Sequence, residues 1–285
     1  GSPTHRPWRA IVVCATQIVI GAMIALVWRQ QQPPSVVARP CSREDYMSMS
    51  RECRPKTCGH IIHDELASPE EVAVLRAIAE GGMAHGGGAG GPTVLDMHSG
   101  ALSLGANFIN VWHRLNATGA PAFANDQQLD VLEAVYARIG AVAERAFGGE
   151  GLRLTSPAFY SRINGSNPAQ TGHDEYWHKH VDRQQYGTFA YTGLLYLSDH
   201  GIDFTGGEFE FHGASQPGRR SEVLVHPRRG RLLLFTSGAE HIHRVRKVDS
   251  GVRLVLTVPF TCDHEAALGA SKLDEARAAA ARSAA

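Results

Sequence analysis

The spacing of hydrophobic residues changes along the chain, and the first distinct segment is a candidate membrane span. Residues 10–28 carry no charged side chain. As a helix with a rise of about 1.5 Å per residue, this run nearly crosses a bilayer core of about 30 Å. Trp8 and Trp28 lie at its two ends, where interfacial aromatic residues are common. We expect a transmembrane signal-anchor at 10–28 after a short tail at 1–9. A cleaved signal peptide is the alternative, but its apolar region is shorter.

Two later stretches have the spacing of amphipathic helices. Ser68 is followed by a proline and, at the third position, by a glutamate; this is the pattern of a helix N-cap, and Gly81 is expected to end that helix. Glycine dominates residues 81–92, which predicts a flexible loop. Apolar residues recur every three or four positions over 126–147 and predict a second helix with one buried face.

From residue 152 onward the pattern changes to short β-branched and aromatic runs separated by Gly, Pro and Asn. These runs predict strands near 158–163, 188–197, 207–211, 222–226, 231–235, 243–248 and 252–259. Together with the two helices they predict a mainly β fold with flanking helices, of the sandwich or jelly-roll kind. The alanine-rich tail at 263–285 is expected to be an exposed helix or a frayed end.

Composition excludes one class of partner and draws attention to one residue type. The 28 Lys and Arg balance 28 Asp and Glu, so the formal net charge is zero and no basic field is available to hold nucleic acid. The hydrophobic fraction of 43% is that of a globular protein. Fifteen histidines are present, each of which can bind a metal or carry a proton, so the positions of the histidines need to be weighed one by one.

The cysteines and two glycosylation sequons indicate an oxidising compartment. Four cysteines follow the apolar run and suit two disulfides in any of three pairings: Cys41, Cys53, Cys58 and Cys262. Sequons begin at Asn116 and Asn164. We expect a single-pass type II membrane protein, with a stem and Cys-rich segment at 29–58 and its main domain in the lumen of the ER or Golgi. The alternative of a zinc site at Cys53 and Cys58 lacks a second ligand pair with finger spacing.

A histidine stands two residues before an acidic residue at three places: His63 and Glu65, His173 and Glu175, and His180 and Asp182. Residues two apart on a strand share a face, so such a pair can bind one metal while a third ligand comes from elsewhere. Two imidazoles and one carboxylate form the facial triad of non-haem Fe(II) oxygenases. The pair at 180 and 182 is favoured, because predicted strands and a distant histidine pair follow it.

That distant pair is His241 and His243, and periodicity does not choose between them, since both face the same way on a strand. His178 likewise shares a face with His180. Arg253 follows ten residues after His243 in another predicted strand. Its guanidinium can hold one carboxylate of a dicarboxylate by paired hydrogen bonds.

The motifs from residue 180 onward resemble, in their order, those of the prolyl 4-hydroxylase type of 2-oxoglutarate- and Fe(II)-dependent oxygenases: HVD, LLYLSD, GGEFEF, PRRGRLLLF, HRV and GVRLVLTV. The resemblance implies a double-stranded β-helix, a cupin-like jelly roll. It places the metal ligands at His180, Asp182 and His243, the last because it directly precedes Arg-Val. It places Arg253 at the C5 carboxylate of 2-oxoglutarate, and Tyr196 in contact with this cosubstrate.

The resemblance also implies an activity and a domain. An oxygenase domain at 59–262, with its core at 158–262, is expected to bind Fe(II), 2-oxoglutarate and O2, with L-ascorbate keeping the iron reduced. It would hydroxylate an aliphatic C–H bond, in a peptide side chain such as proline, and release succinate and CO2. Two alternatives stay open: a catalytically inactive lumenal β-helix that binds a partner, and a cupin-like or zinc hydrolase site.

Overall fold

The structure is a computed structural model that describes residues 35–213, 222–269 and 273–284. The chain divides into two units, 1–35 and 36–285, and every element named below belongs to the second. The signal-anchor expected at 10–28 lies outside the described residues. No helix within the described ranges combines the length and the apolar character that crossing a membrane requires.

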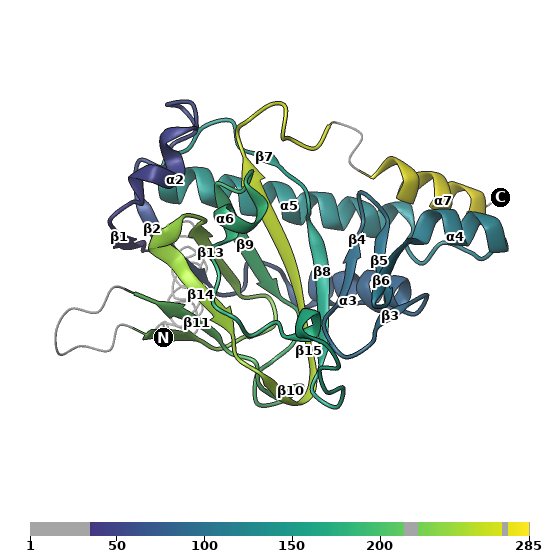
Figure 1. Ribbon diagram of the computed structural model, residues 1–285. Coiled ribbons are helices and arrows are strands. Elements are labelled where there is room, and N and C mark those ends of the chain that lie inside the picture. The colour runs from purple at the N-terminus through teal and green to yellow at the C-terminus, as the bar shows by residue number, and fades with distance from the viewer. Residues whose placement is uncertain (1–34, 214–221, 270–272, 285) are drawn as a thin grey trace, which may run out of the picture. The chain divides into compact units, whose positions relative to one another are not determined.

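Two sheets form the centre of the fold (Figure 1). The larger follows the order β1 (Val37–Arg39), β2 (Cys58–His63), β13 (Leu232–Thr236), β9 (Tyr191–Tyr196), β15 (Val248–Thr261), β8 (Phe159–Asn164), β4 (Thr93–Asp96), β5 (Ala101–Gly105) and β3 (Gly87–Gly88). Three further strands pair with β5 or β15: β6 (Asn107–Asn110), β7 (Arg153–Leu154) and β10 (Phe204–Gly206). The smaller sheet has the order β12 (Glu222–Val225), β11 (Phe209–His212) and β14 (Ile242–Val245).

Two long helices pack on the larger sheet, and shorter ones lie around it. The helices are α2 (Arg43–Met47), α3 (Pro69–Met83), α4 (Val111–Thr118), α5 (Asp126–Phe147), α6 (Asp182–Tyr186) and α7 (Asp274–Ala284). Two 3-10 turns, η1 (Gly172–Asp174) and η2 (Ala239–His241), complete the set. Figure 1 shows α5 running across the strands of the larger sheet.

The residues of β9 alternate between two cores. Leu194 and Tyr196 pack with Phe209 and other residues of the smaller sheet, whereas Tyr191 and Leu195 belong to the core that α3 and α5 cover. Successive side chains of a strand point to opposite faces, so β9 is buried on both sides, and every one of its residues is buried. Full burial of each such side chain contributes about 1.5–3 kcal/mol. This two-sheet arrangement with helices outside confirms the expected mainly β, jelly-roll-like fold.

Most predicted elements are present. Each of the seven predicted strands has a counterpart, and the helix predicted over 126–147 is α5. The capping box of α3 is formed, because the Ser68 hydroxyl accepts the Glu71 N–H and the Glu71 carboxylate accepts the Ser68 N–H.

The end of α3 was predicted wrongly, since the helix passes Gly81 and ends at Met83. A Cβ at Gly82 would lie 2.5 Å from Leu95 Cδ2, so the glycine there allows close packing and does not stop the helix. The predicted loop at 81–92 contains the two-residue strand β3.

The alanine-rich tail is neither frayed nor fully exposed. It forms α7, whose Ala276 and Ala279 are buried. Arg277 of α7 forms ion pairs with Asp126, Asp130 and Glu133 of α5. These contacts with α4 and α5 hold α7 against the rest of the domain.

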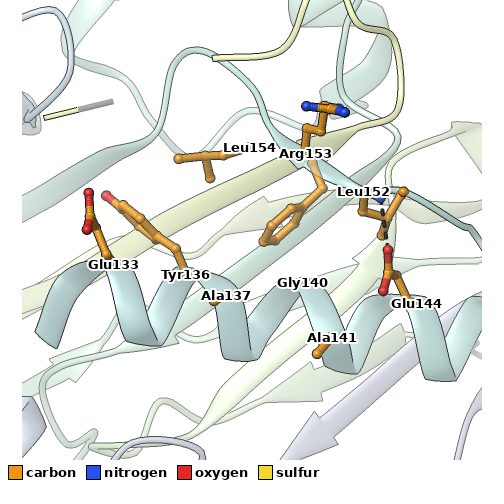
Figure 2. Close-up of a pocket in the computed structure, with 11 residues that line it drawn as sticks. Glu133, Tyr136, Ala137, Gly140, Ala141, Glu144, Leu152, Arg153 and Leu154 are labelled. Carbon is orange, nitrogen blue, oxygen red and sulfur yellow. Dashed lines mark hydrogen bonds between the residues drawn. The ribbon is translucent and has the colours of Figure 1, made fainter. Parts of the chain in front are cut away.

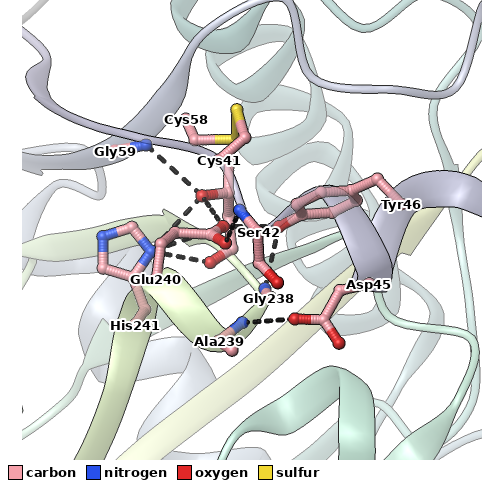
Figure 3. Close-up of a disulfide and its surroundings, with 11 residues drawn as sticks. Cys41, Ser42, Asp45, Tyr46, Cys58, Gly59, Gly238, Ala239, Glu240 and His241 are labelled. Atoms are coloured by element: carbon pink, nitrogen blue, oxygen red, sulfur yellow. Dashed lines mark hydrogen bonds and ion pairs between the residues drawn. A yellow bond between two sulfur atoms is a disulfide. The ribbon is translucent and has the colours of Figure 1, made fainter.

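The two expected disulfides are formed. Cys41 is bonded to Cys58, and Cys53 to Cys262. Because Cys53 and Cys58 have different disulfide partners, the alternative of a zinc site at these two residues is wrong. The first disulfide holds the segment before α2 beside η2, and Figure 3 shows Ser42, Tyr46 and Glu240 around it. Glu240 accepts hydrogen bonds from the Ser42 backbone N–H and the Tyr46 hydroxyl.

Candidate metal centre

The three residues predicted as metal ligands come from two segments that are joined by backbone hydrogen bonds. The N–H of His180 donates to the carbonyl of His243 at 2.9 Å, and the N–H of His243 donates to the carbonyl of His180 at 3.0 Å. Val181 is extended, which places the side chains of His180 and Asp182 on one side before α6 begins. The two-residue spacing therefore acts as predicted, although Asp182 is the first residue of a helix.

The ligand atoms of these residues converge. One nitrogen of each imidazole and one oxygen of the carboxylate all lie within 4.8 Å of one another. Asp182 Oδ1 is 3.6 Å from His180 Nε2 and 3.4 Å from His243 Nε2. A shared ion at the centre of such a set would draw the three ligand atoms to it.

Hydrogen bonds at the opposite ring nitrogens orient both imidazoles. Nδ1 of His180 lies 3.0 Å from the carbonyl of His178, and Nδ1 of His243 lies 2.8 Å from the carbonyl of His241. Since a carbonyl only accepts, each Nδ1 carries the proton and each Nε2 lone pair faces the cluster. This tautomer is the one that binds a metal through Nε2.

The charge states of the cluster also suit a cation. Burial lowers the pKa of His180, and the neighbouring His243 lowers it further, so the ring is neutral. Burial alone would raise the pKa of Asp182, but His243 and the hydroxyl of Thr192 outweigh burial and lower it. That hydroxyl donates to Asp182 Oδ2 at 2.6 Å. Two imidazoles and one carboxylate are a donor set that Fe(II) accepts, so the described residues fit the implied ion.

The structure separates the other candidate histidines from this cluster. His241 lies in η2, and its buried ring contacts His60 and Phe211. Burial lowers the pKa of His241 to about 3. Sequence periodicity could not distinguish His241 from His243, because it assumed a strand where a 3-10 turn precedes β14. His178 is largely exposed and pairs with Glu175 at 2.7 Å.

Of the other two histidine–acid pairs, His63, Glu65 and Glu175 contribute no ligand atom to the cluster. His63 is at the end of β2, and Glu65 follows β2. His173 lies in η1, and Glu175 directly follows this turn.

Arg253 is a buried cation with unused hydrogen-bonding capacity. Its side chain is 2% exposed, and its Nε donates to the carbonyl of Gly207 at 2.8 Å. Its Nη2 is buried without a hydrogen-bond partner, and within the described chain it has no ion pair with a carboxylate. Burial lowers the pKa of Arg253. Because an unpaired buried charge is costly, this guanidinium is suited to bind an anion that enters the site.

Tyr196 lies beside Arg253. The guanidinium carbon is 5.6 Å from the centre of the Tyr196 ring. Burial raises the pKa of Tyr196 to about 12, so the phenol is neutral and keeps its proton for donation. Its hydroxyl is buried without a hydrogen-bond partner of normal geometry. The two residues thus bring unsatisfied donors to the same place.

A cavity of about 480 Å³ connects the cluster with Arg253. His180, Asp182, His243 and Arg253 all line it, and apolar side chains such as Phe159 complete its wall.

Sequence analysis did not identify two residues of this region. Thr192 supports Asp182, and Tyr176 lines the cavity while its hydroxyl accepts the Val248 N–H. Neither has a spacing that would single it out, because both roles depend on tertiary contacts.

A larger cavity, of about 630 Å³, lies between α5 and residues 151–154 (Figure 2). Glu144 on its rim accepts a hydrogen bond from the backbone of Leu152. The described residues that line this cavity include no histidine. The chemistry is concentrated in the smaller cavity.

Comparisons with known proteins agree with this geometry. Residues 166–260 match the family described as the 2OG-Fe(II) oxygenase superfamily. Over 236 residues, the chain is 42% identical to 2-oxoglutarate and iron-dependent oxygenase domain-containing protein 3 of Xenopus tropicalis, covering 81% of this chain and 71% of the relative. The human protein of the same name is 43% identical over 230 residues, covering 79% and 69%. Human prolyl 3-hydroxylase 2 is 37% identical over 73 residues, covering 26% of this chain and 10% of that protein.

Proposed function

Because the chain belongs to the 2OG-Fe(II) oxygenase superfamily, we propose that it is a dioxygenase that hydroxylates an aliphatic C–H bond of a peptide side chain. One observation carries the proposal. A cluster of two imidazoles and one carboxylate opens into the same cavity as a buried arginine that has no anionic partner among the described residues. The first feature is suited to Fe(II) and the second to a dicarboxylate, and a 2-oxoglutarate-dependent enzyme needs both.

Each residue has a defined task in this proposal. His180, Asp182 and His243 hold Fe(II), and the carbonyls of residues 178 and 241 keep the two imidazoles in the right tautomer. Arg253 binds the far carboxylate of 2-oxoglutarate through Nη2, with Tyr196 as a second donor. When bound, Fe(II) and 2-oxoglutarate supply the oxidising chemistry with O2, which yields succinate, CO2 and a hydroxylated product. We include L-ascorbate as the reductant that keeps the iron in the Fe(II) state.

Proline is the side chain that we propose as substrate. The cavity wall next to the cluster contains Phe159, Phe189 and Leu194, which suit an apolar ring. The segment that is similar to prolyl 3-hydroxylase 2 supports the same choice. The position of hydroxylation on the ring is left to product analysis, in which 3-hydroxyproline and 4-hydroxyproline are separated after hydrolysis of the peptide. Oxidation of another residue type in every accepted peptide would refute proline as the substrate.

We propose that the oxygenase domain lies in the secretory lumen, behind a type II anchor at 10–28. The disulfides Cys41–Cys58 and Cys53–Cys262 support an oxidising compartment. Asn116 of the first sequon is exposed on α4, where a glycan can be accommodated. Protease treatment of sealed microsomes tests the orientation: the domain should be protected until detergent opens the vesicles, and cleavage without detergent would reject a lumenal domain.

Succinate release from the detergent-solubilised full chain tests the activity without a known substrate. With Fe(II), L-ascorbate and 2-oxoglutarate, the wild type should form succinate slowly through uncoupled turnover. His180→Ala and Asp182→Ala should abolish it. His113→Ala is the matched control, because His113 is exposed on α4 and should leave turnover unchanged. A fully iron-loaded wild type that forms no succinate would support an inactive binding module instead.

A further inference from the structure

A second cluster of metal-binding side chains lies outside the oxygenase cavity. His200 follows β9, Glu208 lies between β10 and β11, and His226 directly follows β12. Because Phe209 pairs with Val225 in the hairpin of β11 and β12, the next residues outward, Glu208 and His226, are neighbours. The N–H of His200 donates to the carbonyl of Pro227 at 3.0 Å, which brings the third side chain to the same end of the hairpin.

The three side chains already have the spacing of a metal site. One nitrogen of each imidazole and one oxygen of Glu208 lie within 4.8 Å of one another. His200 Nε2 is 3.3 Å from Glu208 Oε1, and the rings of His200 and His226 are 4.9 Å apart between centroids. Two donor atoms on one tetrahedral zinc ion, each about 2.0–2.1 Å from it, are separated by about 3.3 Å. The histidine–glutamate distance therefore needs little adjustment.

Backbone contacts fix the positions of the ligands. The carbonyl of Glu208 accepts the Arg246 N–H at 2.9 Å. The carbonyl of His226 accepts Arg231 Nη1 at 2.8 Å, and Arg231 is itself held by Asp64. The side chains of His200 and Glu208 are 25% and 15% exposed, while His226 is exposed, so an ion can enter from solvent. Such prior ordering reduces the entropy lost when a ligand binds.

An ordinary ion pair accounts for only part of this arrangement. It explains the contact between His200 and Glu208. It does not explain why the His226 ring is held against the His200 ring, with no hydrogen-bond partner for the His226 ring among the residues that the structure describes. We propose that His200, Glu208 and His226 form a second metal site that binds Zn²⁺ through two imidazoles and one carboxylate, with the fourth position open to solvent. Late first-row ions such as Zn²⁺ bind imidazole more tightly than Fe(II) does.

The site has a structural link to the cosubstrate pocket. Gly207, next to Glu208, provides the carbonyl that accepts Arg253 Nε. Gly207 has a φ of +67°, and a Cβ there would lie 3.1 Å from Arg253 Cδ, so the backbone and the arginine are in close contact. Zinc at Glu208 ties this segment to the ends of β9 and β12, and thereby steadies the group that orients Arg253.

Equilibrium dialysis with Zn²⁺ tests the site in the full chain. To exclude the oxygenase centre, His180→Ala and His243→Ala are combined as a background. We expect this variant to bind one Zn²⁺ per chain. Adding His226→Ala or Glu208→Gln should remove that ion, whereas His113→Ala should leave it bound. Equilibrium dialysis of proteins that keep His180 and His243 should give two bound Zn²⁺ ions per chain in the wild type and one in His226→Ala.

Thermal unfolding supplies a readout that does not depend on activity. Zn²⁺ should raise the melting temperature of the background variant by several degrees, and His226→Ala should remove this increase without changing the melting temperature in chelator. Co²⁺ in place of Zn²⁺ should give the visible absorption of a tetrahedral site that disappears with His226→Ala. Zinc that stays bound in both ligand variants would mean an adventitious ion only and would overturn the proposal. A background variant that binds no zinc would overturn it as well.

Discussion

At the scale of single residues, Arg253 has the largest unmet electrostatic requirement in the site. It is 2% exposed, and its Nη2 has no hydrogen-bond partner within the described ranges. Arg253→Leu should raise the 2-oxoglutarate KM about 10-fold to 100-fold, because a hydrogen bond to a charged group contributes about 1.5–3 kcal/mol. Succinate release at varied 2-oxoglutarate concentration measures this change. The matched control, Arg54→Leu, removes an exposed arginine and should leave the KM unchanged.

Arg253→Leu should weaken cosubstrate binding, but it should not lower the thermal stability of the protein without cosubstrate. Since Arg253 has no anionic partner in the part of the chain that the structure describes, its replacement by leucine relieves the cost of a buried charge. Without 2-oxoglutarate, the variant should therefore be at least as stable to heat as the wild type. With 2-oxoglutarate and metal under anaerobic conditions, only the wild type should gain stability. A variant that melts earlier without the cosubstrate would show that Arg253 is mainly structural.

Glu210 should make stability depend on pH. Its side chain is 1% exposed and accepts hydrogen bonds from Arg244 and Arg246. Burial alone would raise the pKa of Glu210, but the two arginines lower it further than burial raises it. The unfolded chain therefore binds a proton at Glu210 more readily than the folded chain does. The contribution of the ionised Glu210 to folding stability is fully present above pH 4.5, the ordinary glutamate value, and is lost as the pH falls through the folded-state pKa.

Glu210→Gln tests that dependence. At pH 7 it should lower the free energy of unfolding by about 1–3 kcal/mol, because the arginines lose a charged acceptor. The difference from the wild type should shrink progressively below pH 4.5. Urea unfolding at several pH values measures it. A difference that stayed constant between pH 7 and pH 3 would contradict the argument.

Sequence reasoning brought together the three residues of the candidate metal centre because the chemistry of two of them is local. His180 and Asp182 lie two residues apart on an extended segment, and this spacing alone places them on one side. The choice of His243 needed family resemblance, because η2 breaks the strand periodicity at His241. Thr192 and Gly207 could not have been found, since each acts through a tertiary contact, to Asp182 and to Arg253 respectively.

At the scale of elements, the segment at 41–47 supports the turn that leads into β14, the strand that carries His243. The Tyr46 hydroxyl donates to Glu240 at 2.5 Å and accepts the Gly238 N–H at 2.8 Å (Figure 3). Burial and Glu240 raise the pKa of Tyr46, so the hydroxyl keeps its proton. These contacts join α2 to η2, two residues before His243.

Tyr46→Phe should therefore destabilise the fold by about 1–3 kcal/mol, because the buried Gly238 N–H loses its acceptor and the Glu240 carboxylate loses one of its donors. Tyr136→Phe is the matched control, since the Tyr136 hydroxyl is buried without a hydrogen-bond partner and its removal should be neutral or stabilising. Chemical denaturation compares the two variants. Equal losses in both would mean that the hydroxyl of Tyr46 does not support η2.

Elements were predictable where local pattern and tertiary packing agree. Helix α5 carries its cap, its apolar face and its terminal glycine in its own sequence, and its bounds were predicted correctly. The strands β4, β5 and β6 were not predicted, because two of them are only four residues long and they pair with each other or with β8. The alanines of α7 have no distinctive pattern, and what fixes the helix is its contact with α4 and α5.

At the scale of the whole molecule, the disulfides link distant parts of the chain. Cys53 and Cys262 are separated by 209 residues and close a loop around nearly the entire oxygenase domain. Cys41 and Cys58 are separated by 17 residues and close a small loop at its edge. Cross-linking removes conformational entropy from the unfolded chain, and the chain-entropy model assigns about 5 kcal/mol to the longer loop and about 3 kcal/mol to the shorter one.

The two disulfides should therefore differ in their effect on stability. Cys53→Ala with Cys262→Ala should lower the free energy of unfolding by about 2 kcal/mol more than Cys41→Ala with Cys58→Ala. Urea unfolding under non-reducing conditions measures the difference, and Cys14→Ala is the control because Cys14 lies outside both pairs.

The smaller loop has a separate role, since it holds the segment that supports η2. Its removal should weaken Fe(II) binding more than removal of the longer loop does. The reverse order of Fe(II) affinities would mean that the position of His243 does not depend on the contacts between residues 41–47 and η2.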